Sequence, residues 1–535
     1  MIELFRDKTR NKTAVLSGVV FLALACLYRW TNLMFTHDSL LIVRNDYEWQ
    51  TSLGRFLNVV YLSLRREVMP PMIAGLFGGF FLIVAVILCV HILDIKRRSS
   101  VILCAGLLVT FETIAFVNAG FILSFEIDML ALLYASLAAW LLTRARSRLR
   151  FPLAVFFIVC SLAHFQSYIE VTIVLVMLAL YRDLLEEKKP SDVFRTGVGA
   201  VLTLLVAGLC YYVTLRIVWS TTGIWPKPTY NSLLNMGKIT ESPLADHLAK
   251  TWLFFFQYLS RPFTMNSRPS GVIHLLLGVY ILAQTAVLVR KKRLSGKAVA
   301  LLLLLIVLFP LGGNCVFLLS NGLKHTLMIY SFVFFDVWAL MLCDIARENK
   351  EPQAESSVSD TASVSESKVS LKEYVVPVLC GMLILNRVLF ANALYLNVDL
   401  LNRATLSFMT RMVDRMERTP GYKIGETPVI IVGHIRENPY VRPLKDFGRL
   451  HSDFLGGHGL DVTFPETYKN YFDYVLNYPV QYVPREEMAE CLENLDLEAI
   501  HNMPIFPEQG GVALIDGVLV VKLSENIEVT EDADW

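Results

Sequence analysis

Residues 71–93 read PMIAGLFGGFFLIVAVILCVHIL and contain no Asp, Glu, Lys or Arg. Roughly 20 apolar residues in a helix are enough to cross a hydrocarbon core about 30 Å thick. The whole chain has the same character, because 54% of its 535 residues are hydrophobic, 18% are charged and the mean hydropathy is +0.49. This composition is too apolar for a soluble protein of such length, and it predicts a protein that resides in a membrane.

The same length criterion, applied along the chain, predicts a polytopic α-helical membrane protein with about eleven transmembrane helices. The predicted spans are 13–30, 71–93, 101–120, 127–142, 152–164, 168–182, 196–218, 271–290, 298–319, 326–345 and 373–394. The two short spans within 152–182 are separated only by HFQSYIE, and a single helix there would reverse the sidedness of everything downstream.

Positive charge orients the predicted spans, because short basic loops remain cytoplasmic. With a cytoplasmic N-terminus, all five of the basic loops fall on one side: DIKRR (94–98), TRARSRLR (143–150), RDLLEEKK (182–189), RKKR (290–293) and RENK (347–350). The N-terminal segment is basic and then apolar without a clear cleavage site, so we expect a retained signal anchor.

The chain divides by composition into four parts. In its C-terminal part, apolar residues first recur at the spacing of a helix. The apolar stretch TPVIIVG then predicts a short buried strand, and VALIDGVLVVKL predicts two strands about an Asp-Gly turn. The Ser- and Glu-rich tract before the last span is typical of a disordered connector. The predicted parts are a transmembrane core (1–345), a cytoplasmic linker (346–372), a last transmembrane helix (373–394) and a small periplasmic α/β domain (395–535).

Charge and cysteine content restrict the function. A net charge of +1 and a pI near 7.6 provide no global attraction to nucleic acid, and we expect no such partner. The nine cysteines are scattered, mostly within apolar runs, and predict neither a disulfide nor a zinc site. No resident metal or cofactor is predicted, and a role for a divalent cation is left open.

The first outer loop begins FTHDSLLIVRNDYEWQTSLGR (35–55) and is charged directly after an apolar span. Residues 39–66 predict one interfacial amphipathic helix, on which Arg44, Glu48 and Arg55 share a face and Trp49 suits the headgroup level. One interpretation is a surface helix with snorkelling arginines and no chemistry.

The position of Asp38 favours a catalytic interpretation. It follows the first span closely, so its carboxylate can lie beside a lipid head group. A carboxylate there can act as general base on a sugar hydroxyl, and neighbouring guanidinium groups can hold a departing phosphate. These are the groups that glycosyl transfer from a lipid-phosphate donor requires.

Further candidates lie at predicted outer ends of spans. Glu126 and Asp128 can belong to an active site or merely cap a helix, and His164 and Glu170 can line a sugar site or form an ordinary loop. Basic residues at span ends suit a lipid phosphate or simply anchor the helix; they are Arg261, Lys324 and His325.

The first loop and the tail resemble a known family. An acid after the first span followed by an interfacial helix is similar to the membrane-embedded GT-C glycosyltransferases. More narrowly, HDSLLIVRNDYEWQTSLGRFLNVV (37–60) resembles the opening motif of the Gtr glucosyltransferases, which modify O-antigen. Where that family usually has Asp-Asp, this chain has His37-Asp38, so only the second acid is kept. The stretches 391–417 and 503–524 resemble the family's last span and terminal domain.

The resemblance implies transfer of a sugar, usually glucose, from a polyprenyl-phosphate donor to a lipid-linked or O-antigen glycan. The reaction would take place at the outer face of a bacterial inner membrane, with inversion at the anomeric carbon and Asp38 as base. Expected partners are the lipid-linked donor, the glycan acceptor, membrane lipids, a donor flippase and a donor-synthesising enzyme. No GxGxxG or P-loop is present, in agreement with a donor that is not a nucleotide.

The resulting site prediction names three catalytic acids and ten substrate-binding residues. The catalytic candidates are Asp38, Asp46 and Glu126; the substrate-binding candidates are Arg44, Glu48, Trp49, Arg55, Asp128, His164, Glu170, Arg261, Lys324 and His325. Two alternatives remain: a transporter or flippase of lipid-linked saccharide, and an O-antigen polymerase or ligase. A transporter would need charges along a path through many spans, whereas the candidate charges gather at one face.

Overall fold

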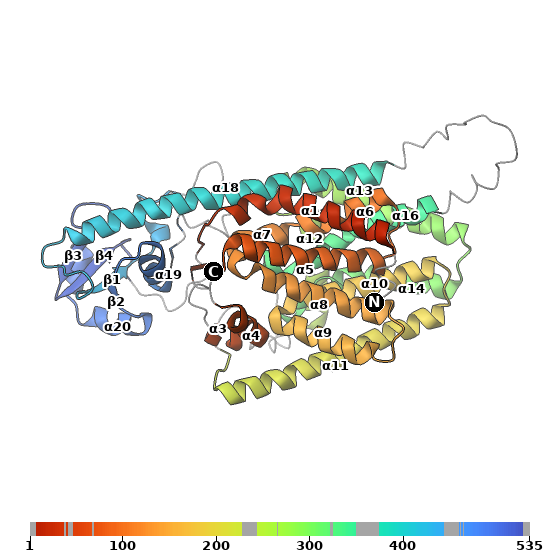
Figure 1. The fold of residues 1–535 in the computed structure, drawn as a ribbon, viewed down its shortest axis with the longest axis horizontal. Coiled ribbons are helices and arrows are strands. Elements are labelled where there is room, and N and C mark those ends of the chain that lie inside the picture. The colour runs from red at the N-terminus through yellow and green to blue at the C-terminus, as the bar shows by residue number, and fades with distance from the viewer. Residues whose placement is uncertain are drawn as a thin grey trace.

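A computed structural model shows a bundle of helices that is joined by one long helix, α18, to a small sheet (Figure 1). The residues that the structure describes are 7–36, 39–40, 47–66, 69–226, 243–264, 266–320, 325–348, 374–442, 460, 462–463 and 465–527.

The helices of the first 222 residues form most of the bundle. They are α1 (Lys8–Thr31), α3 (Tyr47–Ser52), α4 (Phe56–Arg65), α5 (Pro71–Ile92), α6 (Arg98–Thr110), α7 (Glu112–Phe121), η1 (Ile122–Ser124), α8 (Phe125–Thr143), α9 (Arg150–His164), η2 (Gln166–Tyr168), α10 (Ile169–Leu185) and α11 (Pro190–Thr222). The bundle is completed by α12 (Leu244–Ser260), α13 (Ser267–Lys291), α14 (Gly296–Gly312), α15 (Cys315–Leu319), η4 (Thr326–Met328), η5 (Tyr330–Phe332), α16 (Val333–Glu348) and α18 (Val375–Glu417).

Six helical stretches of the described chain are long and apolar enough to cross a membrane: Lys8–Thr31, Pro71–Ile92, Arg98–Thr143, Pro190–Thr222, Ser267–Lys291 and Val375–Glu417. A helix also occupies each of the other predicted spans. However, α9, α10, α14 and α16 have only 15, 17, 17 and 16 residues. A helical membrane protein is therefore confirmed, and the number of eleven crossings remains a prediction.

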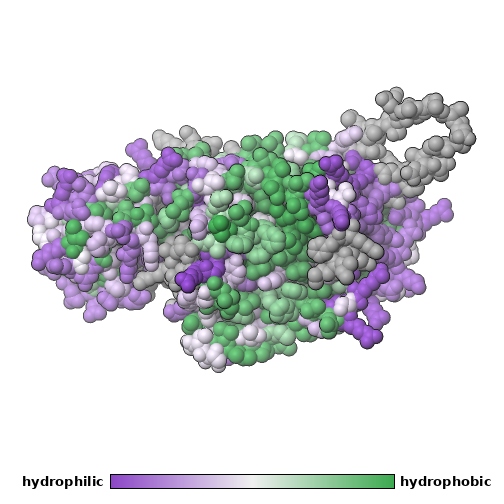
Figure 2. Space-filling view, in the orientation of Figure 1, coloured by the Kyte–Doolittle hydropathy of each residue, from purple (hydrophilic) through white to green (hydrophobic). Residues whose placement is uncertain are grey.

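The surface of the bundle carries a broad apolar band, with polar surface at both ends (Figure 2). Large apolar side chains are exposed on the bundle helices, among them Leu205 and Leu209 on α11 and Leu275 on α13. A continuous apolar surface of this kind is unfavourable in water and is expected where lipid tails surround a protein. The band therefore marks the part of the bundle that lies within the bilayer.

The region 152–182 forms two helices rather than one. The chain leaves α9 at Phe165, which has an extended backbone (φ −155°, ψ 113°), and α10 begins after the short helix η2. A residue with this conformation ends the ladder of helical hydrogen bonds. The prediction of two helices here is confirmed.

Four ionisable side chains are buried together inside the bundle. Arg387 of α18 lies 2.8 Å from Asp336 of α16 through its Nη2 and 3.3 Å from Glu112 at the start of α7 through its Nε. The Nε2 of His274 on α13 lies 3.4 Å from the other Asp336 oxygen. Each of these residues is at most 3% exposed. Such groups are expensive in a membrane unless they are paired, so this buried tetrad joins four helices.

A second charged group lies where α1 begins, in the loop between α5 and α6. Asp94 accepts ion pairs from Arg10 at 3.1 Å, Lys96 at 3.1 Å and Arg182 at 3.2 Å. Partial burial alone would raise the pKa of Asp94, but Arg182, Lys96 and Arg10 outweigh it and hold that pKa below its ordinary value. The loop is thereby fastened to α1 and α10.

Replacing Asp94 by Asn should lower the free energy of unfolding by about 1 kcal/mol at neutral pH, because charge-assisted hydrogen bonds are lost. The depressed pKa means that this stabilisation is complete above the ordinary aspartate pKa and is lost as the pH falls through the folded-state value. Thermal unfolding in detergent should therefore separate wild type from variant at pH 7, and the difference should shrink as the pH falls below the ordinary aspartate pKa. Asp414→Asn, in an exposed pair with Arg418, is the control. An equal effect of both substitutions at pH 7 would contradict this role.

Beyond the bundle, the last turns of α18 pack on a four-stranded sheet of order β2-β1-β4-β3. The strands are β1 (Pro428–Val432), β2 (Gln481–Tyr482), β3 (Val512–Ile515) and β4 (Val518–Lys522), with helices η7 (Ile435–Glu437), α19 (Pro465–Asn470), η8 (Tyr471–Val475), α20 (Arg485–Glu493) and α21 (Leu497–Asn502). The strand β1 runs parallel to both β2 and β4, whereas β3 and β4 form an antiparallel hairpin. We call residues 404–527 the terminal unit.

The hairpin and the buried strand lie where the sequence predicted them. Asp516 and Gly517 form the turn with φ values of 48° and 84°, a conformation that Asp-Gly pairs favour. Four of the five β1 residues are buried, and they belong to a core separate from that of the bundle. The side of the membrane on which this unit lies stays a prediction, and the predicted linker (346–372) falls almost entirely outside the described residues.

Candidate active site

The predicted interfacial helix over 39–66 is interrupted at Gly54. Among the described residues of this stretch, α3 ends at Ser52 and α4 begins at Phe56, and Gly54 between them has a φ of 78°. Two carbonyls of this turn accept hydrogen bonds from distant elements: Gln166 Nε2 donates to Leu53 O at 2.7 Å, and the Tyr211 hydroxyl donates to Gly54 O at 3.0 Å. The single-helix prediction is wrong here, because a left-handed glycine and external donors replace the helical hydrogen bonds.

The break redirects Arg55, which begins α4 instead of continuing the face of Glu48. Its guanidinium carbon lies 4.6 Å above the ring of Phe165, a cation–π contact. Its positive charge also acts on Asp128 in the first turn of α8. Two predicted site residues, Arg55 and Asp128, are thus neighbours, although 73 positions separate them in the sequence.

The other end of α4 is fixed by an ion pair. Arg65 Nε lies 2.8 Å from an oxygen of Glu126, and a second guanidinium nitrogen donates to Leu123 O. The Glu126 side chain is completely buried. An ion pair removed from water must be well matched to be tolerated, so this contact locks α4 against the start of α8.

His164 attaches the middle of α4 to the end of α9. Its Nδ1 lies 2.7 Å from the Asn58 amide oxygen, and its ring stacks on Tyr134 with centroids 5.9 Å apart. Only 4% of the residue is exposed. The imidazole is therefore held in one orientation, with the nearby ring of Tyr61 in edge contact.

The structure therefore brings four predicted site residues together and adds two that the sequence interpretation missed. We call the set the α4 cluster: Arg55, Asn58, Arg65, Glu126, Asp128 and His164. Asn58 and Arg65 are seven positions apart, the spacing of two helical turns. That spacing could have marked them once Gly54 was recognised as the start of a new helix.

Glu170 lies elsewhere and is fully engaged by the protein. One of its oxygens accepts from Val316 N at 2.8 Å, and the other accepts from the Ser331 hydroxyl at 3.2 Å. Only 1% of Glu170 is exposed. In this position it satisfies a backbone amide at the start of α15, which a helix end requires.

The remaining described candidates occupy three different elements. Glu48 is exposed and Trp49 is half-buried on α3. Arg261 ends α12 in the tight turn to α13, is exposed, and has no hydrogen bond or ion pair to its side chain within the described residues. His325 begins η4 and accepts from Leu327 N.

Asp38, Arg44, Asp46 and Lys324 fall outside the described residues, so their predicted roles remain predictions. The described residue Thr36 donates from its hydroxyl to Gly120 O at 2.8 Å, close to the end of α7. The turn after α7 leads into α8, which carries Glu126 and Asp128. The described start of the first loop is thus attached to the element that carries the two acids of the α4 cluster.

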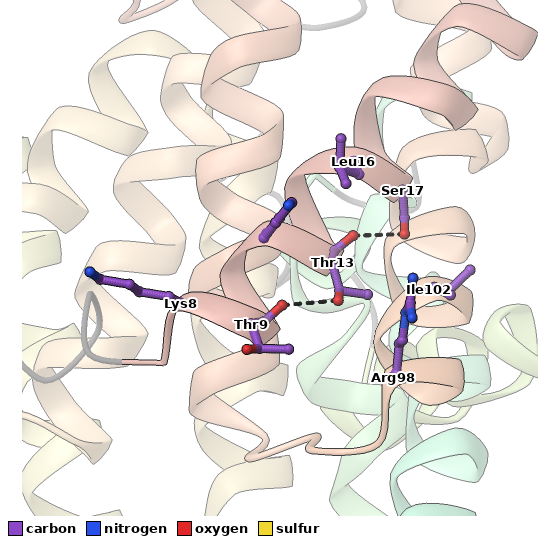
Figure 3. Close-up of a pocket in the computed structure, with 8 residues that line it drawn as sticks. Lys8, Thr9, Thr13, Leu16, Ser17, Arg98 and Ile102 are labelled. Carbon is purple, nitrogen blue, oxygen red and sulfur yellow. Dashed lines mark hydrogen bonds between the residues drawn. The ribbon is translucent and has the colours of Figure 1, made fainter.

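A hollow at the other end of α1 lies away from this cluster. It is lined by the first turns of α1 and α6 through Lys8, Thr9, Lys12, Thr13, Leu16, Ser17, Arg98 and Ile102 (Figure 3). The hydroxyls of Thr13 and Ser17 donate to backbone carbonyls one turn earlier in the same helix. None of these described lining residues is an acid, and nothing in the structure shows what fills the hollow.

In the part of the chain that the structure describes, no group of three or more His, Cys, Asp and Glu side chains could hold a metal ion. The acids of the α4 cluster are instead close to guanidinium groups.

Comparison with known proteins identifies a family. The family model described as glucosyl transferase GtrII matches residues 13–338, from α1 into the first turns of α16. No curated protein and no solved structure matches the chain. The matched region contains the whole α4 cluster and leaves out α18 and the terminal unit.

Proposed function

The chain belongs to the GtrII glucosyl transferase family, and we propose that it moves glucose from a polyprenyl-phosphate donor to a lipid-linked or O-antigen glycan. The match over residues 13–338 is the observation that carries glucosyl transfer. It favours an enzyme over the transporter, the alternative from another class.

The apolar band supports a lipid-linked donor. A polyprenyl chain remains within the bilayer and presents its phosphosugar at the interface, where the α4 cluster lies at one end of the bundle (Figures 1 and 2). In the proposed orientation, the N-terminus and the basic loops are cytoplasmic, and the α4 cluster and terminal unit are periplasmic. The membrane is the inner membrane of a bacterium.

In the proposed reaction, Asp38 removes the proton from an acceptor hydroxyl. The hydroxyl oxygen forms a bond to the anomeric carbon as the bond from that carbon to the phosphate oxygen breaks, so the configuration inverts. The electron pair leaves with polyprenyl phosphate, and the proton resides on the carboxyl group. A positioned base contributes about 10²- to 10⁴-fold to such a step.

Cations near the scissile bond would stabilise the departing phosphate. We assign this role to Arg55 and His325. Arg55 lies over the ring of Phe165, and Ser167, two residues after Phe165, donates to Leu327 O, two residues after His325. Arg44 and Lys324 are assigned to the same role from the sequence alone. In the proposed site Glu126 and Arg65 hold α4 in place, because their charges already neutralise each other.

The proposal is tested by the mass of the surface-glycan repeat unit in three strains: with the chain, without it, and with the chain but without the enzyme that makes the polyprenyl-phosphate sugar. A hexose should be added only in the first strain. Addition of a hexose in the third strain would exclude the lipid-linked donor. If the repeat unit has the same mass in all strains, and lipid-linked precursor stays on the inner face of the membrane in cells lacking the chain, a transporter would be favoured. A change in chain length without a new hexose would favour a polymerase or ligase.

A further inference from the structure

Two asparagine side chains fasten the first loop to parts of the chain beyond the family match. Asn402 of α18 accepts from Phe35 N through its Oδ1 at 3.0 Å, and its Nδ2 donates to Phe35 O. Asn470 at the end of α19 donates to Leu40 O at 2.9 Å. These contacts lie on either side of Asp38 in the sequence.

The bonded residues are also fixed by packing. Leu40 is completely buried and belongs to the core of the terminal unit, together with residues such as Met409 and Val429. Phe35 packs against the cores of both the bundle and the terminal unit. The described residues on both sides of the predicted base therefore contact the terminal unit, and Thr36 contacts α7.

The helix that supplies Asn402 is itself held in register. Asn392 of α18 donates to Leu24 O of α1 at 2.8 Å, and Asp399 accepts from the Tyr28 hydroxyl at 3.0 Å. Figure 1 shows α18 running along the bundle and on into the terminal unit. A single continuous helix of 43 residues therefore carries both contacts to the bundle and the amide that binds Phe35.

An amide that bonds both the N–H and the C=O of one residue fixes that residue's orientation, because both bonds must be kept at once. Catalytic geometry is sensitive to such support, since a displacement of about 1 Å can cost about 10²-fold in rate. We propose that Asn402 and Asn470 are positioning residues, through which α18 and the terminal unit hold the loop that presents the base. This inference rests on the proposed function, in which Asp38 is that base.

The test compares Asn402→Leu and Asn470→Leu with Asn392→Leu in the full-length chain. Leucine has the same number and branching of side-chain heavy atoms as asparagine, and its side chain forms no hydrogen bond. Asn392 is the control, because it donates from α18 to a backbone carbonyl of α1, Leu24 O, and not to the first loop. The bond from the Tyr28 hydroxyl to Asp399 remains in this variant, so α18 keeps a contact with α1. The readouts are kcat and KM for a polyprenyl-phosphate glucose donor, with thermal unfolding measured alongside.

We expect kcat to fall about 10- to 100-fold for Asn402→Leu and Asn470→Leu, while KM for the donor and the unfolding temperature of each stay close to those of Asn392→Leu. Asn402→Ser keeps one hydrogen-bonding group, so its kcat should lie between those of Asn402→Leu and wild type. This variant takes the place of Asn402→Leu if the leucine variant fails to fold. A rise in KM at unchanged kcat, or wild-type kcat in both leucine variants, would overturn the inference.

The two proposals can fail separately. If Asp38→Asn is inactive and both leucine variants keep wild-type kcat, the positioning role fails and the base assignment stands. If Asp38→Asn keeps wild-type activity, the base assignment fails whatever the asparagine variants do.

Discussion

Asp38→Asn is expected to lower the rate of glucosyl transfer by about 10²- to 10⁴-fold, which is the usual contribution of a general base. The substitution keeps the size of the side chain but removes its ability to accept a proton at neutral pH. The acceptor hydroxyl would then have to attack without deprotonation. The measurement is the initial rate with a polyprenyl-phosphate glucose donor and a glycan acceptor, at matched amounts of protein in liposomes.

The KM for the donor separates chemistry from binding in this experiment. Loss of kcat at nearly unchanged donor KM identifies a group that acts in the transition state, whereas a raised KM alone identifies ground-state binding. Asp414→Asn removes an exposed acid far along α18 and should keep the wild-type rate. If Asp38→Asn retains more than about a tenth of the wild-type rate, Asp38 is not the base, and Asp46 becomes the next acid to test.

The sequence predicted the elements that depend on local patterns. The apolar stretches became helices because long apolar segments satisfy their backbone only in helical form within a bilayer. The hairpin about Asp516 and Gly517 was also predicted correctly, because an Asp-Gly pair between two apolar runs is a local signal. Neither prediction required knowledge of distant contacts.

Contacts between distant residues could not be predicted in the same way. Arg65 and Glu126 are 61 positions apart, and Asn402 and Asn470 bind residues 367 and 430 positions earlier in the chain. An asparagine in an amphipathic helix carries no periodic signal that names its partner. The sequence therefore predicted four members of the α4 cluster, namely its two acids, its histidine and Arg55. The other two, Asn58 and Arg65, were found only in the structure.

The break at Gly54 illustrates why one prediction was wrong. Apolar residues recur at helical spacing through residues 39–66, and a helix often tolerates a single glycine. The sequence therefore predicted one uninterrupted helix. Here the donors that occupy the turn come from Gln166 and Tyr211, which lie more than 100 positions later. Tertiary contacts thus decided against the local pattern.

Arg387→Met should destabilise the bundle more than any other single substitution discussed, by about 3–5 kcal/mol, because it leaves buried carboxylates without their guanidinium. Arg387 is 1% exposed and contacts both Asp336 and Glu112. Methionine fills a similar space, so the loss reports on charge more than on packing. The measurement is thermal unfolding in mild detergent. Arg403→Met, which replaces an exposed arginine paired with Asp399 on the same helix, should cost less than about 1 kcal/mol.

A compensated variant distinguishes charge from shape in the buried tetrad. When Glu112→Gln and Asp336→Asn accompany Arg387→Met, the uncompensated charges disappear together, and most of the lost stability should return. His274 would then face an amide in place of a carboxylate, so recovery should be incomplete. If Arg387→Met unfolds at the same temperature as Arg403→Met, these ion pairs do not hold α7, α16 and α18 together. If the triple variant is no more stable than Arg387→Met, the loss comes from packing around the methionine rather than from buried charge.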